Sequence, residues 1–178
     1  FSNEEILTRI AQHSYLPANE LLLDMIKSSN KKFKVAFSIS GTAIEQFQRF
    51  MPEFLESLKK LVATGCVEFI SEPYAHSLAA LTDIDEFRRQ VELHNQLIYT
   101  EFGQKPKVFK NTEFVYNDEI AAYIADMGYK AVLTEGAKHI LGWKSPNYIY
   151  TSAGAKKLKV LFRNSKLSDF FVMRLGAT

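Results

Sequence analysis

The pattern of apolar positions along the chain predicts strands and helices in alternation. Several short runs are candidate β-strands, and some are nearly continuously apolar, which is typical of parallel strands covered on both faces. The runs lie at residues 33–40, 67–71, 107–111, 130–134, 147–152 and 159–164.

The segments between these runs have helical periodicity and recognisable start and stop signals. Ser2 to Glu5 reads SNEE, which is a possible capping box at the start of a first helix. Pro52 interrupts the apolar periodicity of residues 42–63, so we expect it to be the first residue of a new helix. Further helices are expected over residues 17–29, from Asp83 or Asp85 to Gly103, and from Asn117 to Gly128.

The order of these elements in the middle of the chain is βαβαβαβ. This order favours the α/β class, with a parallel sheet or barrel. No internal repeat or linker is evident, and a length of 178 residues favours one domain. If the sheet closes into a barrel, the chemistry is expected at the C-terminal ends of the strands.

Composition and charge then exclude several classes of function. The 22 basic and 20 acidic residues are scattered and give a net charge of +2, which argues against a nucleic-acid partner. No stretch approaches the roughly 20 apolar residues of a membrane span. Cys66 is the single cysteine, so no internal disulfide can form. The chain begins without Met and shows no signal-peptide pattern, and we expect a piece of a longer polypeptide. A cytoplasmic location is a separate expectation.

Carboxylates beside polar or aromatic partners follow three of the predicted strands. Glu72 follows 67–71, together with Tyr74 and His76. Glu113 follows 107–111, and Glu135 follows 130–134. A fourth polar group follows the last strand and contains Arg163, Asn164, Ser168 and Asp169.

Each of these residues also has a simpler interpretation. Glu135 is equally well explained as the cap of a following helix, and Asp169 as an N-cap. His76 alone is more often a hydrogen-bonded core histidine than a ligand. The remaining histidines lack metal-ligand spacing and are interpreted as structural; they are His13, His94 and His139.

The recurrence of carboxylates at successive strand ends nevertheless indicates a site. A pair of carboxyl groups about 5 Å apart, one nucleophile and one acid/base, is what retaining glycoside hydrolysis requires. Tyr74, Tyr116 and Trp143 could supply aromatic platforms for sugar rings.

A series of segments then makes a resemblance visible over almost the whole chain. They read YLPANELLLDMI, FKVAFSISGTAIEQF, GCVEFISEPYAHSLAAL, FKNTEFVYND, GYKAVLTEG, LGWKSPNYIY and LFRNSKLSDFF. Together they resemble the α-amylase-like branch of glycoside hydrolase family 57. The resemblance implies a distorted (β/α)7 barrel of the α/β class that acts on α-1,4-glucans, such as starch or glycogen, with retention of configuration.

The same resemblance implies roles for individual residues. Glu113, in KNTEF, corresponds to the nucleophile, and the acid/base is an aspartate in LSDFF. The resemblance implies two consecutive aspartates in this motif, where this chain has Asp169 and Phe170. If the first position is the functional one, Asp169 is the acid/base; if the second is, Phe170 has replaced it. No metal and no cofactor are expected. The expected substrate-binding residues are Glu72, Tyr74, His76, Asn111, Glu135, Trp143, Arg163 and Asn164.

The family's first, histidine-containing motif is expected just upstream of Phe1, and its C-terminal helical region is also absent. Residues 1–178 are therefore expected to form one domain, most of a catalytic barrel without its first strand. Two alternatives remain open. One is a homologue that binds glucan without hydrolysing it, and the other is a metal-dependent polysaccharide deacetylase, which needs clustered Asp and His ligands.

Overall fold

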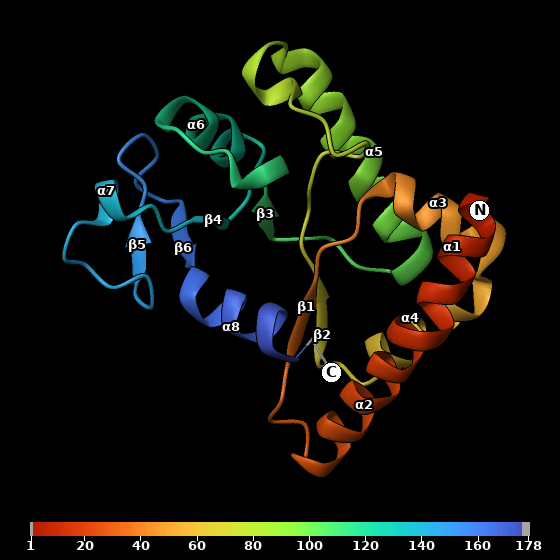
Figure 1. The fold of residues 1–178 in the computed structure, drawn as a ribbon. Coiled ribbons are helices and arrows are strands. Elements are labelled where there is room, and N and C mark those ends of the chain that lie inside the picture. The colour runs from red at the N-terminus through yellow and green to blue at the C-terminus, as the bar shows by residue number, and fades with distance from the viewer. Residues whose placement is uncertain (1, 176–178) are drawn as a thin grey trace. The chain divides into compact units, whose positions relative to one another are not determined.

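The computed structural model of the protein describes residues 2–175, with the side chains of Lys138 and residues 171–175 left aside (Figure 1). The chain divides into two compact units. Unit 1 comprises the residues up to His76 together with Asp85–Pro106, and unit 2 comprises Ser77–Ile84 and the residues from Lys107 onward. The single domain over residues 1–178 stays a prediction.

Unit 1 begins with a long, interrupted helical segment. It consists of α1 (Asn3–Ile10), a π-helical turn (Ala11–Tyr15) and α2 (Leu16–Ser28). The predicted capping box is confirmed, because Ser2 Oγ accepts from the Glu5 N–H at 3.2 Å and the Glu5 carboxylate accepts from the Ser2 N–H at 2.8 Å. The π-helical turn ends at Tyr15, two residues before Pro17, whose missing N–H removes one α-helical hydrogen bond to the turn.

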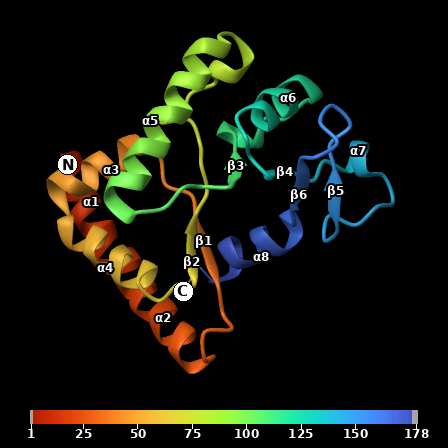
Figure 2. The same cartoon turned by 180° about the vertical axis from the view of Figure 1, so that it is seen from behind.

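The rest of unit 1 is built around two short parallel strands, β1 (Val35–Phe37) and β2 (Val67–Phe69), paired with Val35 opposite Val67. The helices are α3 (Gly41–Phe50), α4 (Pro52–Val62) and α5 (Ile84–Phe102), the last entering unit 1 at Asp85 (Figure 2). Pro52 is the first residue of α4, as predicted. The apolar faces of α3, α4 and α5 form a core with β2, which includes Ile44, Phe47, Phe54, Leu58, Leu61, Phe69 and Ile98.

Unit 2 contains a four-stranded sheet in the order β3-β4-β6-β5. Its strands are β3 (Val108–Lys110), β4 (Ala131–Glu135), β5 (Ile149–Thr151) and β6 (Lys159–Arg163). Its helices are α6 (Asp118–Asp126), α7 (Lys138–Leu141) and α8 (Ser165–Leu175), and its short 3-10 turns are Ala79–Leu81 and Thr112–Phe114. Asn117 caps α6 by accepting from the Ile120 N–H at 2.8 Å, which confirms that prediction.

The predicted strands are all present; β4 is shifted by one residue with its length unchanged, and the others are shorter than predicted. β3, β4 and β6 are parallel, whereas β5 is antiparallel to β6. The sequence pattern did not predict the antiparallel direction of β5. The direction follows from the connection between β5 and β6, because residues 152–158 are too few for a crossover between parallel strands, which takes a dozen or more.

The α/β class is confirmed, with parallel strands in both units. Helix α8 was not predicted. Within residues 2–175, no helix combines the length and the apolar character needed to cross a membrane.

Candidate active site

The C-terminal ends of three parallel strands in unit 2 carry the predicted residues. β3 and β6 both pair with β4 in parallel, so the three strands end at the same edge of the sheet. Glu113 lies just after β3, Glu135 is the last residue of β4, and Arg163 is the last residue of β6. Glu135 and Arg163 are direct partners in the strand register.

Glu113 lies in a tight turn with an unusual backbone. Both Glu113 (φ 51°) and the following Phe114 (φ 56°) are in the left-handed region. Neither is a glycine, and such a conformation costs about 1 kcal/mol or more per residue unless the surroundings impose it. The Glu113 side chain is exposed. A strained turn that presents an exposed carboxylate at a strand end is the kind of feature that active sites retain.

Two side chains hold this turn. Asn111 is buried; its Oδ1 accepts from the Thr112 N–H at 3.0 Å, and its Nδ2 donates to the Val115 carbonyl at 3.1 Å. From the neighbouring strand β4, Thr134 Oγ1 donates to the Phe114 carbonyl at 2.9 Å. Asn111 was expected to bind substrate, and these contacts show that it stabilises the turn around Glu113.

Arg163 links two carboxylates. Its Nη1 donates to Glu135 at 3.1 Å and its Nη2 to Asp169 at 2.7 Å. The guanidinium also lies over the Phe114 ring, 5.9 Å from its centroid. The Ser165 hydroxyl donates to the other Glu135 oxygen at 2.5 Å. This hydrogen bond, together with the Arg163 guanidinium, lowers the pKa of Glu135, so Glu135 is ionised in the folded protein.

The simpler interpretations of Glu135 and Asp169 do not hold. Asp169 lies inside α8, and the cap of that helix is Asn164, whose Oδ1 accepts from the Leu167 N–H at 3.0 Å. Asn164 Nδ2 donates to Asn147 at 2.9 Å. Glu135 receives its hydrogen bonds from Ser165 and Arg163, so it joins the strand end to the start of α8.

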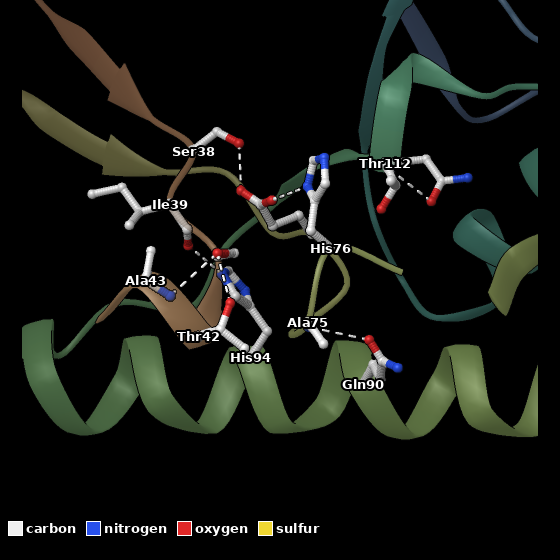
Figure 3. A network of polar contacts seen from close by, with 12 residues as sticks. Ser38, Ile39, Thr42, Ala43, Ala75, His76, Gln90, His94 and Thr112 are labelled. Carbon is white, nitrogen blue, oxygen red and sulfur yellow. Dashed lines mark hydrogen bonds and ion pairs between the residues drawn. The ribbon is translucent and has the colours of Figure 1, made fainter. Parts of the chain in front are cut away.

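A second cluster lies in unit 1, at the ends of β1 and β2 (Figure 3). Glu72 is almost fully buried, and its Oε1 accepts from Ser38 Oγ at 2.5 Å. His76 Nδ1 lies 3.5 Å from Glu72 Oε2. His76 is exposed and has a left-handed backbone (φ 53°). The predicted Glu72 and His76 therefore do meet, and Ser38 is a partner that the sequence did not single out.

Helix α5 contributes three side chains that bind the segments around this cluster, and Figure 3 shows two of them, Gln90 and His94. The Gln90 amide oxygen accepts from the Ala75 N–H at 3.2 Å, and Asn95 Oδ1 accepts from Ser71 Oγ at 2.8 Å. His94 is fully buried with Nε2 2.9 Å from the Ile39 carbonyl. Burial lowers the pKa of His94, so the ring is neutral and donates its Nε2–H.

The aromatic candidates differ in exposure: Tyr74 and Tyr116 are half-buried, whereas Trp143 is exposed. The Tyr74 hydroxyl donates to Glu45 at 2.6 Å, and burial together with this carboxylate raises the pKa of Tyr74 to about 12. Tyr116 donates to Ser152 Oγ at 2.9 Å. Trp143 follows α7 with 93% of its surface exposed, so its ring is available to a ligand.

Comparison with known proteins identifies the chain. Residues 1–174 match glycosyl hydrolase family 57. The chain belongs to this family. A protein of Methanocaldococcus jannaschii named "Putative alpha-amylase" is 44% identical over 176 residues, which cover 98% of this chain and 37% of that protein. The chain thus spans less than half the length of this relative.

Solved structures show the same fold. A 4-alpha-glucanotransferase from Thermococcus litoralis superposes with a TM-score of 0.78 at 18% identity, over 96% of this chain and 26% of that one. A GH57 branching enzyme from Thermococcus kodakaraensis, in complex with glucose and additives, gives a TM-score of 0.75 at 14% identity, over 96% and 45% of the two chains. The fold is therefore part of the (β/α)7 barrel of family 57.

The candidate site also contains residues that the sequence did not single out. Thr134, Ser165 and Ser38 are hydroxyl residues that contact the candidate carboxylates or their turn. Their signal is weak, because a hydroxyl next to an apolar run also occurs in ordinary strand ends. Among residues 2–175, no group of three or more His, Cys, Asp or Glu side chains is arranged to hold a metal ion.

Proposed function

We propose that this chain forms most of the catalytic barrel of a retaining glycoside hydrolase that acts on α-1,4-glucans. Family membership supports the enzyme class, and the relatives named above include an α-amylase by name and a glucanotransferase by title. The expected partner is therefore an α-glucan chain, with no nucleic acid, no membrane and no cofactor. The cytoplasmic location stays a prediction.

One observation carries the catalytic assignment: the ion pair between Arg163 and Asp169 at 2.7 Å. Arg163 ends β6, and Glu113 follows β3 at the same edge of the sheet. The pair therefore ties Asp169, in α8, to the strand ends that carry Glu113. Phe170 offers no group that can exchange a proton, and its side chain is half exposed. These facts favour Asp169 over position 170 as the acid/base.

The proposed reaction has two steps. Glu113 attacks the anomeric carbon while protonated Asp169 gives its proton to the departing glycosidic oxygen, leaving a glycosyl-enzyme ester. Asp169, now a carboxylate, then takes a proton from water, which attacks the ester and releases the sugar with retained configuration.

Arg163 fits the second of these steps best. A guanidinium stabilises a carboxylate in its charged form, which is the form that Asp169 takes as a general base. When Asp169 carries a proton, it needs Arg163 less, and Glu135 is a second carboxylate that can retain the guanidinium. Arg163 therefore has a partner in both states of the cycle.

The test uses the full-length protein and maltooligosaccharides. Glu113→Gln is expected to abolish release of reducing ends, and Asp169→Asn to lower it by about 10²- to 10⁴-fold, the usual contribution of a general acid/base. Azide added to Glu113→Ala should yield a glycosyl azide of inverted configuration. Phe170→Ala is the matched neighbour and should remain active. Unchanged turnover in Glu113→Gln would refute the assignment.

A second candidate is a homologue that binds glucan without hydrolysing it. Phe170 favours it, since the family resemblance expects a carboxylate pair where this chain has Asp169 followed by Phe170. Binding of glycogen by the full-length protein without any release of reducing ends would support it. Product analysis by chromatography also separates hydrolysis from transfer, because a transferase lengthens some maltooligosaccharides while it shortens others.

A further inference from the structure

Two adjacent residues at the end of β4 are each linked, through one intermediate residue, to one member of the candidate catalytic pair. Thr134 donates its hydroxyl to the carbonyl of Phe114, in the turn that carries Glu113. Glu135 accepts from Arg163, which in turn binds Asp169. Successive strand residues point to opposite sides, so one residue pair can reach two different neighbours.

Thr134 acts on the left-handed turn. Its side chain is buried, with 3% of the residue exposed, and the hydrogen bond to the Phe114 carbonyl is 2.9 Å long. Without this bond the Phe114 carbonyl loses its hydrogen bond to β4, which helps to hold φ at Glu113 and Phe114 in the left-handed region. The direction of the Glu113 carboxylate depends on these angles.

Glu135 acts on α8 through two contacts. Its carboxylate accepts from Ser165, the first residue of α8, at 2.5 Å, and from Arg163 at 3.1 Å. The first contact fixes where the helix begins, and the second fixes the guanidinium that binds Asp169. Glu135 is thus linked to Asp169 by two routes: through Ser165 and α8, and through Arg163.

The strand that carries both residues is well placed for this role. β4 is paired on both sides, with β3 and with β6, and Thr134 and Glu135 lie opposite Phe162 and Arg163 in the register. A central strand with both edges hydrogen-bonded moves less than an edge strand or a loop.

We propose that Thr134 and Glu135 are positioning residues: Thr134 orients the nucleophile Glu113, and Glu135 orients the acid/base Asp169 through Arg163 and Ser165. This inference rests on the proposed function. It assigns Glu135 to positioning rather than to contact with the sugar.

Thr134→Val, in the full-length protein, replaces the hydroxyl with a methyl group of similar size. We expect kcat to fall about ten- to hundredfold with KM little changed, because a displacement of about 1 Å at a reacting atom costs as much as 10²-fold. Thr134→Ser keeps the hydroxyl and should recover most of the activity. Thr151→Val, at an exposed position of β5, is the matched control and should behave as wild type. If Thr134→Val does not fold, Thr134→Ala carries the same test without added volume.

Glu135→Gln removes the charge that binds Arg163 and should lower kcat. The size of this loss should depend on how much protonation the leaving group of the substrate needs. A maltooligosaccharide needs a proton on its leaving oxygen, whereas a 4-nitrophenyl maltooligoside cleaved at the aryl bond needs almost none. The loss should therefore be at least tenfold larger on the maltooligosaccharide, while Thr134→Val should affect both substrates alike. Glu68→Gln, exposed in β2, is the matched control.

A crystal structure of Thr134→Val should show the backbone of Glu113 outside the left-handed region.

The outcomes separate the two proposals. If Glu113→Gln and Asp169→Asn are inactive while Thr134→Val and Glu135→Gln match wild type, the positioning proposal alone is overturned. A rise in KM without loss of kcat in Glu135→Gln would make Glu135 a substrate-binding residue instead. Equal losses on both substrates in Glu135→Gln would reduce its role to general stability. Full activity of Glu113→Gln would overturn both proposals.

Discussion

The ring of Tyr74 occupies the space in which Gly41 would carry a side chain. A Cβ on Gly41 would lie 2.3 Å from Tyr74 Cδ2, far inside van der Waals contact. The backbone N–H of the next residue, Thr42, also donates to the Tyr74 carbonyl at 3.2 Å. Gly41 is thus required by a close approach, and it fixes where an expected substrate-binding ring lies.

The first prediction is that Gly41→Ala displaces Tyr74. Overpacking of this kind costs about 1–3 kcal/mol of the free energy of unfolding. In a Tyr74→Ala background the obstacle is gone, and alanine at the start of α3 should be neutral or stabilising by about 0.5–1 kcal/mol. Urea unfolding of the single and double variants measures this coupling. An equal cost of Gly41→Ala in both backgrounds would show that the ring is not the obstacle.

The second prediction concerns the pH dependence of stability. Burial lowers the pKa of His94 below its ordinary value of 6.5, so the unfolded chain binds a proton more readily than the folded one. The contribution of the neutral His94 to the free energy of unfolding should therefore be fully present above pH 6.5. It should be lost as the pH drops from there toward the folded-state pKa, by at most about 1.4 kcal/mol per pH unit for this one group.

His94→Gln should remove that part of the slope, since glutamine can still donate to the Ile39 carbonyl but does not titrate. The free energy of unfolding of the full-length protein, measured from pH 7.5 to 5 in urea, gives the slope. His13→Gln, in the exposed part of the π-helical turn, is the matched control and should leave it unchanged. A wild-type slope in His94→Gln would contradict the prediction.

The third prediction concerns the buried carboxylate of unit 1. Ser38→Ala removes the hydroxyl that lies 2.5 Å from Glu72, and hydrogen bonds to charged groups contribute about 1.5–3 kcal/mol. The variant should lose that much stability at neutral pH. In a Glu72→Gln background residue 72 carries no charge, so the loss of stability caused by Ser38→Ala should fall to about 1 kcal/mol or less. Thermal unfolding of the four proteins tests this, and additive effects would argue against the contact.

Local patterns in the sequence were sufficient for most of the fold. Pro52, Asn117 and the Ser2–Glu5 box act within one helical turn, so their effects can be predicted from neighbouring residues. The direction of β5 depends on a connection whose length matters only once β6 is known to be its partner. Helix α8 begins at a cap, Asn164, inside a segment that was interpreted by its chemistry alone.

The candidate site was predictable in its residues but not in its contacts. Carboxylates after apolar runs indicated Glu72 in unit 1 and Glu113 and Glu135 in unit 2. Glu113 and Glu135 do lie at one edge of a sheet, because β3 and β4 are parallel neighbours, and the catalytic and binding roles stay predictions. The partners that define their roles are distant in sequence: Ser38 is 34 residues from Glu72, and Arg163 is 28 residues from Glu135. Such pairs result from strand order and register, which periodicity does not encode.

The last prediction concerns Trp143. Because this side chain is exposed, its replacement can change ligand binding without changing the stability of the fold. With 93% of its surface in contact with solvent, the ring contributes little to the core, so Trp143→Ala should leave the melting temperature unchanged. If the ring stacks on sugar, the same change should weaken binding of glycogen or maltooligosaccharide by about two- to tenfold, the range expected for an aromatic contact. Ile140→Ala is the matched control, since Ile140 is 74% exposed in the preceding helix and offers no aromatic face. Affinity electrophoresis in glycogen gels compares the two variants, and equal mobility shifts would assign the effect to apolar surface rather than to stacking.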